Sequence, residues 1–306
     1  MKNLLVALDG SKQSEAVLPV ALAVASSCEY HPVLLSVWET GVLEQLEGET
    51  PEVMELTARG TKDMEVYLHA LAPRLDEFGL SATLDVRAGH PAVEIIGAAR
   101  DRSADMIAIC THGRRAVPGG RRGSVADKVL RGSPVPVLAV GPRVALPEAG
   151  QGARIKRILV PLDGSAEAEE AIPLAIDLAH GLGARVDLLR VVTPALGQYA
   201  GALPEERERE LDRHREKVAT KYLAALRDAY SQERFSTSVE TGYPAAAIAG
   251  YVERSGVGLV VMTSHSRYAA GLWTLGGVAD SLIDGPAPVV LVRPSTAPPV
   301  QEARHG

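Results

Sequence analysis

Residues 110–140 read CTHGRRAVPGGRRGSVADKVLRGSPVPVLAV, and this stretch decides which fold the chain is expected to adopt. Its first residue ends the apolar run 106–110, which is typical of a buried strand. A loop rich in glycine and arginine follows, then a helix over 123–131 and an apolar strand over 135–140. Glycines let backbone N–H groups approach a ligand, and a helix N-terminus is partly positive. The stretch therefore predicts a strand–loop–helix–strand unit whose loop suits an anion such as phosphate.

The residues before this stretch alternate in the same way between apolar runs and amphipathic segments. The apolar runs are continuous, which a parallel strand buried on both faces requires. Gly79 is expected to end one helix, and Pro91 to open the next. Strands are expected at 4–8, 33–38, 82–87 and 106–110, and helices at 15–27, 52–78 and 92–102. This alternation predicts an α/β fold with an open, parallel, five-stranded sheet and helices on both faces.

The second half of the chain repeats the first at an offset of 152 to 154 residues. The sequence ILVPLDGSAEAEEAIPLAIDLA at 158–179 matches LLVALDGSKQSEAVLPVALAVA at 4–25. A repeat of this length indicates two tandem sheets rather than a solenoid. The expected parts are a first domain over 1–141, a linker rich in Pro, Gly and Ala over 142–154, a second domain over 155–294 and a tail over 295–306.

Composition narrows the class of protein. A net charge of −6 over 306 residues argues against general binding of nucleic acid. The two cysteines, Cys28 and Cys110, lie far apart in apolar surroundings and are expected to be reduced core residues, as in a cytoplasmic protein. The apolar run at the N-terminus is too short for a signal peptide, and no segment approaches the roughly 20 apolar residues that cross a bilayer. The sequence thus predicts a soluble, cytoplasmic protein with no membrane partner.

Three loops of the first half are expected to form a ligand site. In an open parallel sheet, ligands bind beyond the carboxyl ends of the strands, where the strand order reverses. One loop begins at Asp9, one contains Val37 and one spans 111–124. Together they offer a carboxylate, free backbone groups and an anion cradle, a combination that suits a nucleotide. Neither GxxxxGK[ST] nor GxGxxG is present, which excludes the P-loop and the dinucleotide-binding motif.

Four motifs resemble those of the universal stress proteins, specifically the tandem type with two such domains. They are VALDGS after the first strand, THG in the glycine-rich loop, GSVADKVL and PVPVLAV. Nucleotide-binding members share the pattern G-x2-G-x9-G-[ST]. Gly113, Gly123 and Ser124 match it, whereas its first glycine falls on Cys110. The resemblance implies a Rossmann-like fold of the adenine nucleotide α-hydrolase type, with ATP as the ligand and Mg²⁺ bound, if at all, through the phosphates.

The resemblance also implies roles for individual residues. Asp9 and the Val37 backbone would lie near adenine, the backbone of 109–110 near ribose, and the pattern glycines and serine on the phosphates. No catalytic residue and no metal ligand is expected. The nucleotide-binding candidates are Asp9, Val37, Ile109, Cys110, Gly113, Gly123, Ser124 and Val125.

The second half departs further from the pattern. Only one of its three glycines survives, the serine hydroxyl is lost, and the nine intervening residues carry one arginine where the first half has four. Weaker nucleotide binding, or none, is expected in this half. The pattern positions fall on Thr263, Ser266, Gly276 and Gly277, while Asp163 and Val191 are kept.

Several of these residues also have a structural interpretation. The Asp-Gly-Ser turn gives Asp9 a capping role that is compatible with ligand contact. His112 and His265 recur at the same place in both halves and are expected to hold the loop by hydrogen bonds rather than to bind metal. Trp38 and Trp273 are expected to pack rather than to stack on a cofactor. The loop arginines could be merely solvated, but next to a glycine cradle and a helix start they favour a phosphate site; they are Arg114, Arg115, Arg121 and Arg122.

The leading functional hypothesis is a stress-responsive protein whose ATP occupancy alters its conformation or partners. AMP, a cyclic nucleotide or another phosphorylated metabolite would suit the same cradle. One alternative is a slow Mg²⁺-dependent ATPase, for which Asp9 and Asp127 are the only nearby carboxylates. Another is a ligand-free scaffold, because the apolar edge strands at 135–140 and 289–292 seek a partner. We expect the two halves to pair through these strands, and two tandem chains to form a homodimer.

Overall fold

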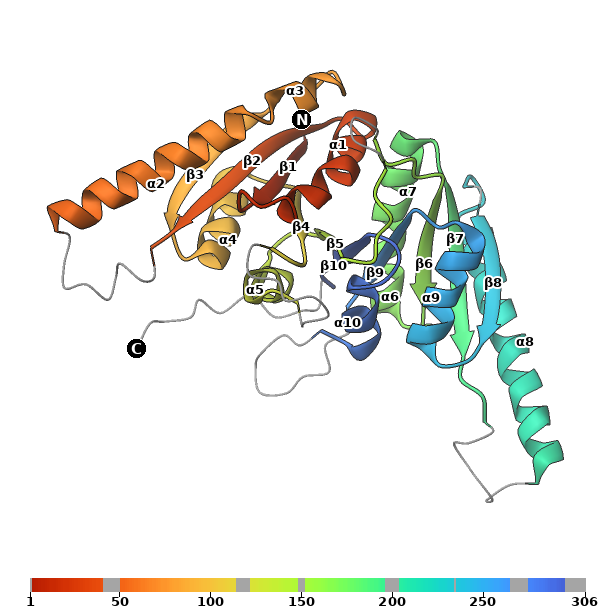
Figure 1. Ribbon diagram of the computed structural model, residues 1–306. Helices are drawn as coiled ribbons and strands as arrows, with labels where there is room; N and C mark the ends of the chain where they lie inside the picture. The colour runs from red at the N-terminus through yellow and green to blue at the C-terminus, as the bar shows by residue number, and fades with distance from the viewer. Residues whose placement is uncertain are drawn as a thin grey trace.

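The computed structural model describes residues 2–40, 50–113, 122–147, 152–195, 204–233, 235–264 and 275–294. Its elements alternate between strand and helix in both halves (Figure 1). The first half contains β1 (Lys2–Leu8), the 3-10 turn η1 (Ser14–Val17), α1 (Leu18–Ser27), β2 (Tyr30–Glu39), α2 (Pro51–His69), α3 (Ala72–Asp76), β3 (Thr83–Gly89), α4 (Pro91–Asp101), β4 (Met106–Cys110), α5 (Ser124–Gly132) and β5 (Val137–Val140). The second half contains β6 (Arg157–Leu162), α6 (Ala166–Glu169), α7 (Ala171–Leu182), β7 (Arg185–Val192), α8 (Glu205–Ala229), β8 (Phe235–Thr241), α9 (Pro244–Ser255), β9 (Leu259–Thr263), α10 (Gly277–Ile283) and β10 (Val289–Val292).

All these strands belong to one sheet with the order β3-β2-β1-β4-β5-β10-β9-β6-β7-β8. Neighbouring strands within each half are parallel. The halves join where β5 and β10 pair antiparallel, with Leu138 opposite Val290. The prediction that the halves pair through these strands is therefore confirmed. Because the strand order reverses across the join, the halves are related by a pseudo-two-fold axis.

The predicted α/β class, with helices on both faces, is confirmed. Successive residues of a strand point to opposite faces, so Leu4 and Val6 enter one core while Leu5 and Ala7 enter the other. The first core also receives buried residues of α1, α2, α7 and α8, and the second those of α4, α5, α9 and α10. The continuous apolar runs in the sequence thus correctly indicated buried parallel strands, because helices cover both faces of every central strand.

The predicted single helix over 52–78 is wrong. The structure divides it into α2 and α3, with a break at Ala70 and Leu71. Proline lacks the N–H that would continue the α-helical ladder, and Pro73 lies in the first turn of α3. The helix also ends two residues earlier than predicted, at Asp76, but Gly79 closes the turn that follows: its φ is 64°, and the amide after it, Leu80 N–H, donates to Leu75 O at 3.1 Å.

The predicted helix over 15–27 also begins differently. Its first residues form the 3-10 turn η1, and the α-helix proper starts at Leu18. Ser11 Oγ accepts a hydrogen bond from Ser14 N–H at 3.1 Å, while the Ser14 hydroxyl donates to Ser11 O at 2.8 Å. Pro19 has no N–H to donate to the carbonyl of Glu15, which explains why one regular α-helix does not run through both parts.

Helices α1 and α7 pack against each other across the junction of the halves (Figure 1). A Cβ on Gly181 would lie 2.5 Å from Cys28 Sγ and 2.6 Å from Ser27 O, so only glycine allows this approach. Both cysteines are free; Cys110 is buried as predicted, whereas Cys28 is only half-buried. The described part of the linker returns over the first half, since Ala153 N–H donates to Pro19 O at 3.1 Å.

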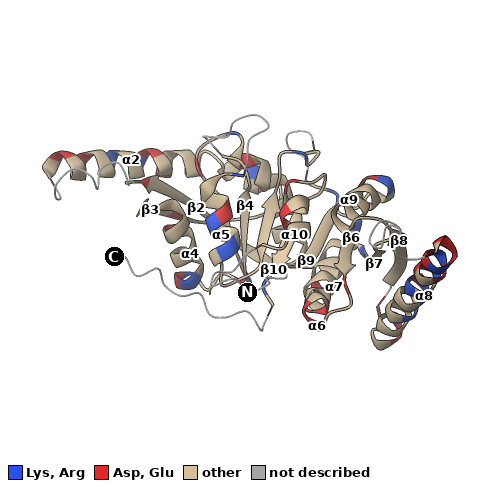
Figure 2. Cartoon of the chain, turned by 90° about the horizontal axis from the view of Figure 1, so that it is seen from below, with Lys and Arg blue, Asp and Glu red and all other residues tan. Residues whose placement is uncertain are grey.

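Charged side chains lie mainly on the helices, and α8 carries many of both signs along its length (Figure 2). The central strands are nearly free of charge in the same view. Among the helices that the structure describes, none has the length and apolarity needed to cross a membrane.

Candidate functional site

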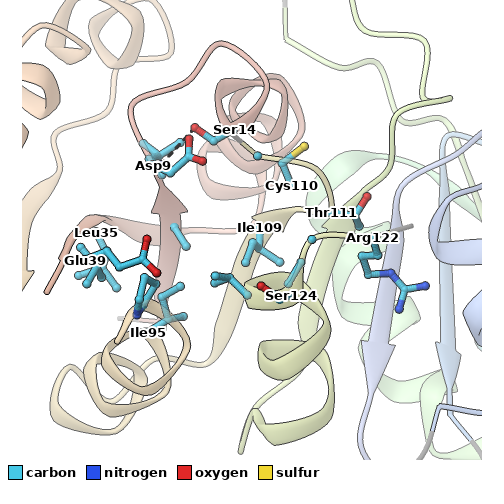
Figure 3. A pocket seen from close by; sticks show the side chains of 18 of the residues that line it. Asp9, Ser14, Leu35, Glu39, Ile95, Ile109, Cys110, Thr111, Arg122 and Ser124 are labelled. Carbon is cyan, nitrogen blue, oxygen red and sulfur yellow. Dashed lines mark hydrogen bonds between the residues drawn. The ribbon is translucent and has the colours of Figure 1, made fainter. Parts of the chain in front are cut away.

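A cavity of about 590 Å³ opens at the carboxyl ends of β1, β2 and β4, between the starts of α4 and α5 (Figure 3). This is the edge of the sheet at which the sequence placed a ligand, beside β1 where the strand order reverses. All of the first-half candidates line it, so the structure brings them together. They are Asp9, Val37, Ile109, Cys110, Gly113, Gly123, Ser124 and Val125.

Asp9 holds a turn at one side of the cavity. Its Oδ1 accepts hydrogen bonds from the backbone N–H of Ser11 at 2.9 Å and from the Ser11 hydroxyl at 2.6 Å. In the second half, Asp163 Oδ1 accepts from Ser165 N–H and hydroxyl at the same two distances. The turn alone therefore accounts for an aspartate at both places. Only Asp9 also belongs to the cavity described above.

Gly113 and Gly123 bring backbone close to the cavity for two different reasons. A Cβ on Gly113 would lie 2.6 Å from Asp9 Oδ2, so a side chain there would collide with the carboxylate. Gly123 is the N-cap of α5, and its N–H donates to Thr111 O at 2.9 Å, which closes the base of the loop. The loop can thus approach a ligand with main chain alone.

The N-terminus of α5 forms the other side of the cavity. Ser124 and Val125 begin the helix and line the cavity, and Ser124 is exposed to solvent. The first N–H groups of an α-helix have no acceptor within the helix, and the helix dipole makes this end partly positive. An anion is therefore expected at this side of the cavity, opposite the carboxylates of Asp9 and Glu39 (Figure 3).

Cys110 stands at the position of the pattern's first glycine. Its side chain does not lie beside that of Ile109, which contributes to the apolar lining of the cavity. Its side chain belongs to the core on the α1 side, whereas that of Ile109 belongs to the opposite core. Burial raises the pKa of the Cys110 thiol, although hydrogen bonds from the backbone of His112 and Thr111 oppose the shift. The thiol is therefore neutral at physiological pH, and Cys110 offers the cavity mainly its backbone.

Trp38 lines the cavity where β2 ends. Its indole ring packs directly over Gly60 of α2, so closely that a Cβ there would overlap the ring. This agrees with the predicted packing role. The hydrogen bond between Thr111 Oγ1 and His112 Nδ1 at 2.9 Å likewise agrees with a loop-holding role for this histidine. Trp273 and His265 lie outside the described residues.

The arginine part of the prediction needs correction. Arg122 lines the cavity, but its guanidinium points away from it toward the second half (Figure 3). Its Nη2 donates to the backbone oxygen and to Oδ1 of Asp280, both at 3.1 Å. The guanidinium is only 7% exposed and neutralised by carboxylates, so Arg122 is not a phosphate ligand in this arrangement. Arg114, Arg115 and Arg121 lie outside the described residues.

The sequence missed several lining residues that come from other elements. Those from α-helices are Met64 of α2, Pro91 and Ile95 of α4, and Ala126 of α5. Ile95 lies in the predicted helix over 92–102, but its place beside the cavity depends on how α4 packs, which the sequence does not give. Glu39 directly follows the predicted strand over 33–38, in the loop that contains Val37, so the sequence placed it near the site without giving it a role. The lining residues that the sequence did not assign to the site are Ala7, Leu8, Ser14, Leu35, Met64, Pro91, Ile95 and Ala126.

The second-half candidates lie at the corresponding ends of the strands, with different chemistry. Thr263 ends β9 and is 3% exposed, and no hydrogen-bond partner of its hydroxyl is found among the described residues. Gly276 caps α10, and its N–H donates to the side chain of Ser264 at 3.2 Å instead of to a backbone carbonyl. Asp163 follows β6, Val191 lies in β7 and Gly277 opens α10, whereas Ser266 is outside the described residues. Within the described parts of the chain, no group of three His, Cys, Asp or Glu side chains could hold a metal ion.

Comparison with known proteins agrees with this architecture. The universal stress protein family model matches residues 1–141 and 154–293. A universal stress protein from Archaeoglobus fulgidus DSM 4304 is 21% identical with a TM-score of 0.69, over 95% of this chain and 98% of that chain. A Pseudomonas aeruginosa UCBPP-PA14 protein is 17% identical with a TM-score of 0.64, over 96% and 94% of the two chains. A universal stress protein in complex with cAMP is 19% identical with a TM-score of 0.35, over 45% and 95%. No curated protein matches the sequence.

Proposed function

The chain belongs to the universal stress protein family, with two such domains in tandem, and we propose that it is an ATP-binding member whose main nucleotide site lies in the first half. One observation carries the proposal: all first-half residues of the nucleotide pattern and its neighbours line a single cavity. In this proposal, nucleotide occupancy changes the conformation or the partners of the protein during stress.

The cavity fits a nucleotide in size and in the distribution of its groups. A volume of about 590 Å³ lies within the range of small-molecule sites. The apolar side chains of Leu35, Val37 and Ile95 suit a base, and the start of α5 suits phosphates. Gly113 leaves space beside Asp9 that a Cβ would fill. Mg²⁺ would reach this site bound to the phosphates, because they supply the oxygen ligands it prefers.

ATP binding is favoured over ATP hydrolysis, because the two carboxylates considered for catalysis already interact with other side chains. Asp9 Oδ1 accepts two hydrogen bonds from Ser11, as its counterpart does in the second half. Asp127 accepts from Arg131 at 2.9 and 3.1 Å and pairs with Arg122 at 3.4 Å. Carboxylate oxygens that already accept hydrogen bonds from other groups are less available to take the proton of an attacking water.

The hypothesis of a ligand-free scaffold is less favoured. Its main support was that each half ends in an apolar edge strand that would need an external partner. The hydrogen-bonding edges of β5 and β10 are used within the chain, where they pair with each other. They therefore offer no open edge to an external partner.

Calorimetric titration of the full chain with ATP, AMP, cAMP and adenosine, each with and without Mg²⁺, tests the proposal. We expect one ATP site per chain. The variant Ser124→Gly gives the first half the residue that the second half carries at this position. A hydrogen bond to a charged group contributes about 1.5–3 kcal/mol, so we expect ATP affinity to fall by about tenfold or more.

The matched control is Gly277→Ser, which adds the hydroxyl to the second half and should leave the first-half affinity unchanged. Mass spectrometry of ligand released from freshly purified protein identifies the bound nucleotide. Two equal sites per chain would contradict the predicted asymmetry. No nucleotide binding, together with a melting temperature that ATP leaves unchanged, would support the scaffold instead.

A further inference from the structure

We propose that the second half holds the ligand loop of the first half in place through Asp280 and Asp284, and so acts as a positioning part of the nucleotide site. The inference rests on the proposed function for its ligand. The contacts on which the inference is based are made between protein residues and involve no ligand. They lie where α5 and α10 meet at the centre of the molecule (Figure 2).

Arg122 is the first contact. Arg122 lies at the end of the loop, directly before Gly123, the N-cap of α5. Its guanidinium reaches across the junction of the halves. Its Nη2 lies 3.1 Å from Asp280 Oδ1 and 3.5 Å from Asp284 Oδ2. The Arg122 side chain is only 7% exposed, so its charge depends on nearby carboxylates: Asp127 of its own half lies 3.4 Å from Nη1, and the two from the second half lie beside Nη2. The carboxylates of α10 thus fix the position of this end of the loop.

Thr111 is the second contact, at the start of the same loop. It is fully buried, and its hydroxyl donates to Asp284 Oδ1 at 3.0 Å. Its carbonyl accepts the N–H of Gly123 at 2.9 Å, which joins the two ends of the loop. Asp284 therefore touches both ends: Thr111 directly through one oxygen and Arg122 through the other.

The main chain at Asp284 packs closely against the residue that follows β5. A Cβ on Gly141 would lie 2.5 Å from Ile283 O and 2.9 Å from Asp284 Cα, so the end of β5 and the end of α10 leave no room for a side chain. Asp284 is the C-cap residue of α10, so the end of this helix places its carboxylate beside Arg122.

The residues of this ion pair are not repeated at the corresponding positions of the two halves. At the repeat positions, Arg122 corresponds to Leu275 and Asp284 to Arg131, so the second half has neither partner of this ion pair. Arg131 instead bonds Asp127 within its own helix at 2.9 Å. Ser264, the counterpart of Thr111, accepts the N–H of Gly276 in its own half. The half that departs from the nucleotide pattern thus supports the loop of the half that keeps it, and among the described residues no counterpart of this ion pair supports the second half.

The experiment compares the full chain with Asp284→Ala in two ways. Hydrogen exchange without ligand reports on the amide of Gly123, and we expect it to exchange about tenfold faster because both ends of the loop lose an anchor. Titration then compares ATP with adenosine. We expect ATP affinity to fall about tenfold, or about 1.4 kcal/mol, and adenosine affinity to stay unchanged because adenosine has no phosphates to reach the loop.

Two further variants make the result specific. Arg122→Leu, which installs the residue of the second half, should reproduce the loss for ATP, and adding Asp280→Ala to it should change little further. The control is Asp177→Asn, which removes another ion pair between the halves, Lys2–Asp177 at 3.4 Å, without touching the loop. We expect it to leave both the exchange and the binding unchanged.

The outcomes separate this inference from the proposed function. Unchanged exchange at Gly123 in Asp284→Ala overturns the inference, whatever the ligand. Equal losses for ATP and adenosine also overturn it, because they would show a general weakening of the first half rather than loss of loop position. If the wild-type chain binds neither ligand, the proposed function is wrong, and the exchange measurement still decides whether α10 holds the loop.

Discussion

At the residue scale, the candidate site depends on a turn that both halves share and on a glycine that only the first half keeps. Asp9 and Asp163 hold their turns with the same geometry, so the aspartate alone does not mark a ligand site. Gly113 lies against the Asp9 carboxylate, whereas the second half has Ser266 at this pattern position. The contact between glycine and carboxylate is therefore the feature that a substitution should test.

Gly113→Ala is expected to displace the Asp9 carboxylate, because the new Cβ would lie 2.6 Å from Oδ2. We expect ATP affinity to fall about tenfold and the free energy of unfolding to fall by about 1–3 kcal/mol, the usual cost of overpacking. Calorimetric titration and urea unfolding measure the two effects. The control is Gly277→Ala in α10, where an added Cβ meets no atom within 4 Å, and which should not destabilise the protein. Equal behaviour of the two variants would show that the contact with Asp9 is unimportant.

At the element scale, the junction of the halves depends on how closely α1 approaches α7. Gly181 allows the two helices to meet at Cys28, and burial there raises the pKa of the Cys28 thiol to about 11. The short helix α10 has a comparable role, since the residues at and after its end contact β5 and the ligand loop. Both α7 and α10 therefore contact the first half in addition to packing on their own half.

Gly181→Ala is expected to destabilise the junction, because its Cβ would lie 2.6 Å from Ser27 O and 2.9 Å from Cys28 Cα, which are backbone atoms that cannot move aside. We expect a loss of about 1–3 kcal/mol in the free energy of unfolding, measured by urea denaturation. Gly97→Ala in α4 is the matched helical control. Its Cβ would meet only Arg87 Nη1, at 3.6 Å, so it should be neutral or stabilising by up to about 1 kcal/mol. A neutral Gly181→Ala would mean that α1 and α7 can separate without cost.

At the scale of the whole molecule, the tandem chain is an internal dimer. The antiparallel pairing of β5 with β10 joins the two parallel sheets into one. This pairing uses the strand edge of each half, so a homodimer of tandem chains would have to form through another surface. The sheet's two outer strands, β3 and β8, are its remaining edges.

A chain of residues 1–141 alone is expected to form a dimer, because without the second half β5 presents an unpaired, apolar edge from Val137 to Val140. Size-exclusion chromatography with light scattering measures this, with the full chain at the same concentration as the comparison. A first half that stays monomeric would contradict the view that β5 needs a partner strand.

The sequence by itself determined the tandem α/β fold and the first-half positions at the cavity. Both follow from local rules: apolar periodicity specifies strands and helices, and parallel strands bring the residues at their carboxyl ends to one edge of the sheet. The break before Pro73 was also legible in principle, because proline acts locally. Only the tertiary structure decided what Arg122 does. Its partners, Asp280 and Asp284, lie on the other half of the chain, and the strength of an ion pair depends on distance and burial, which sequence spacing does not contain.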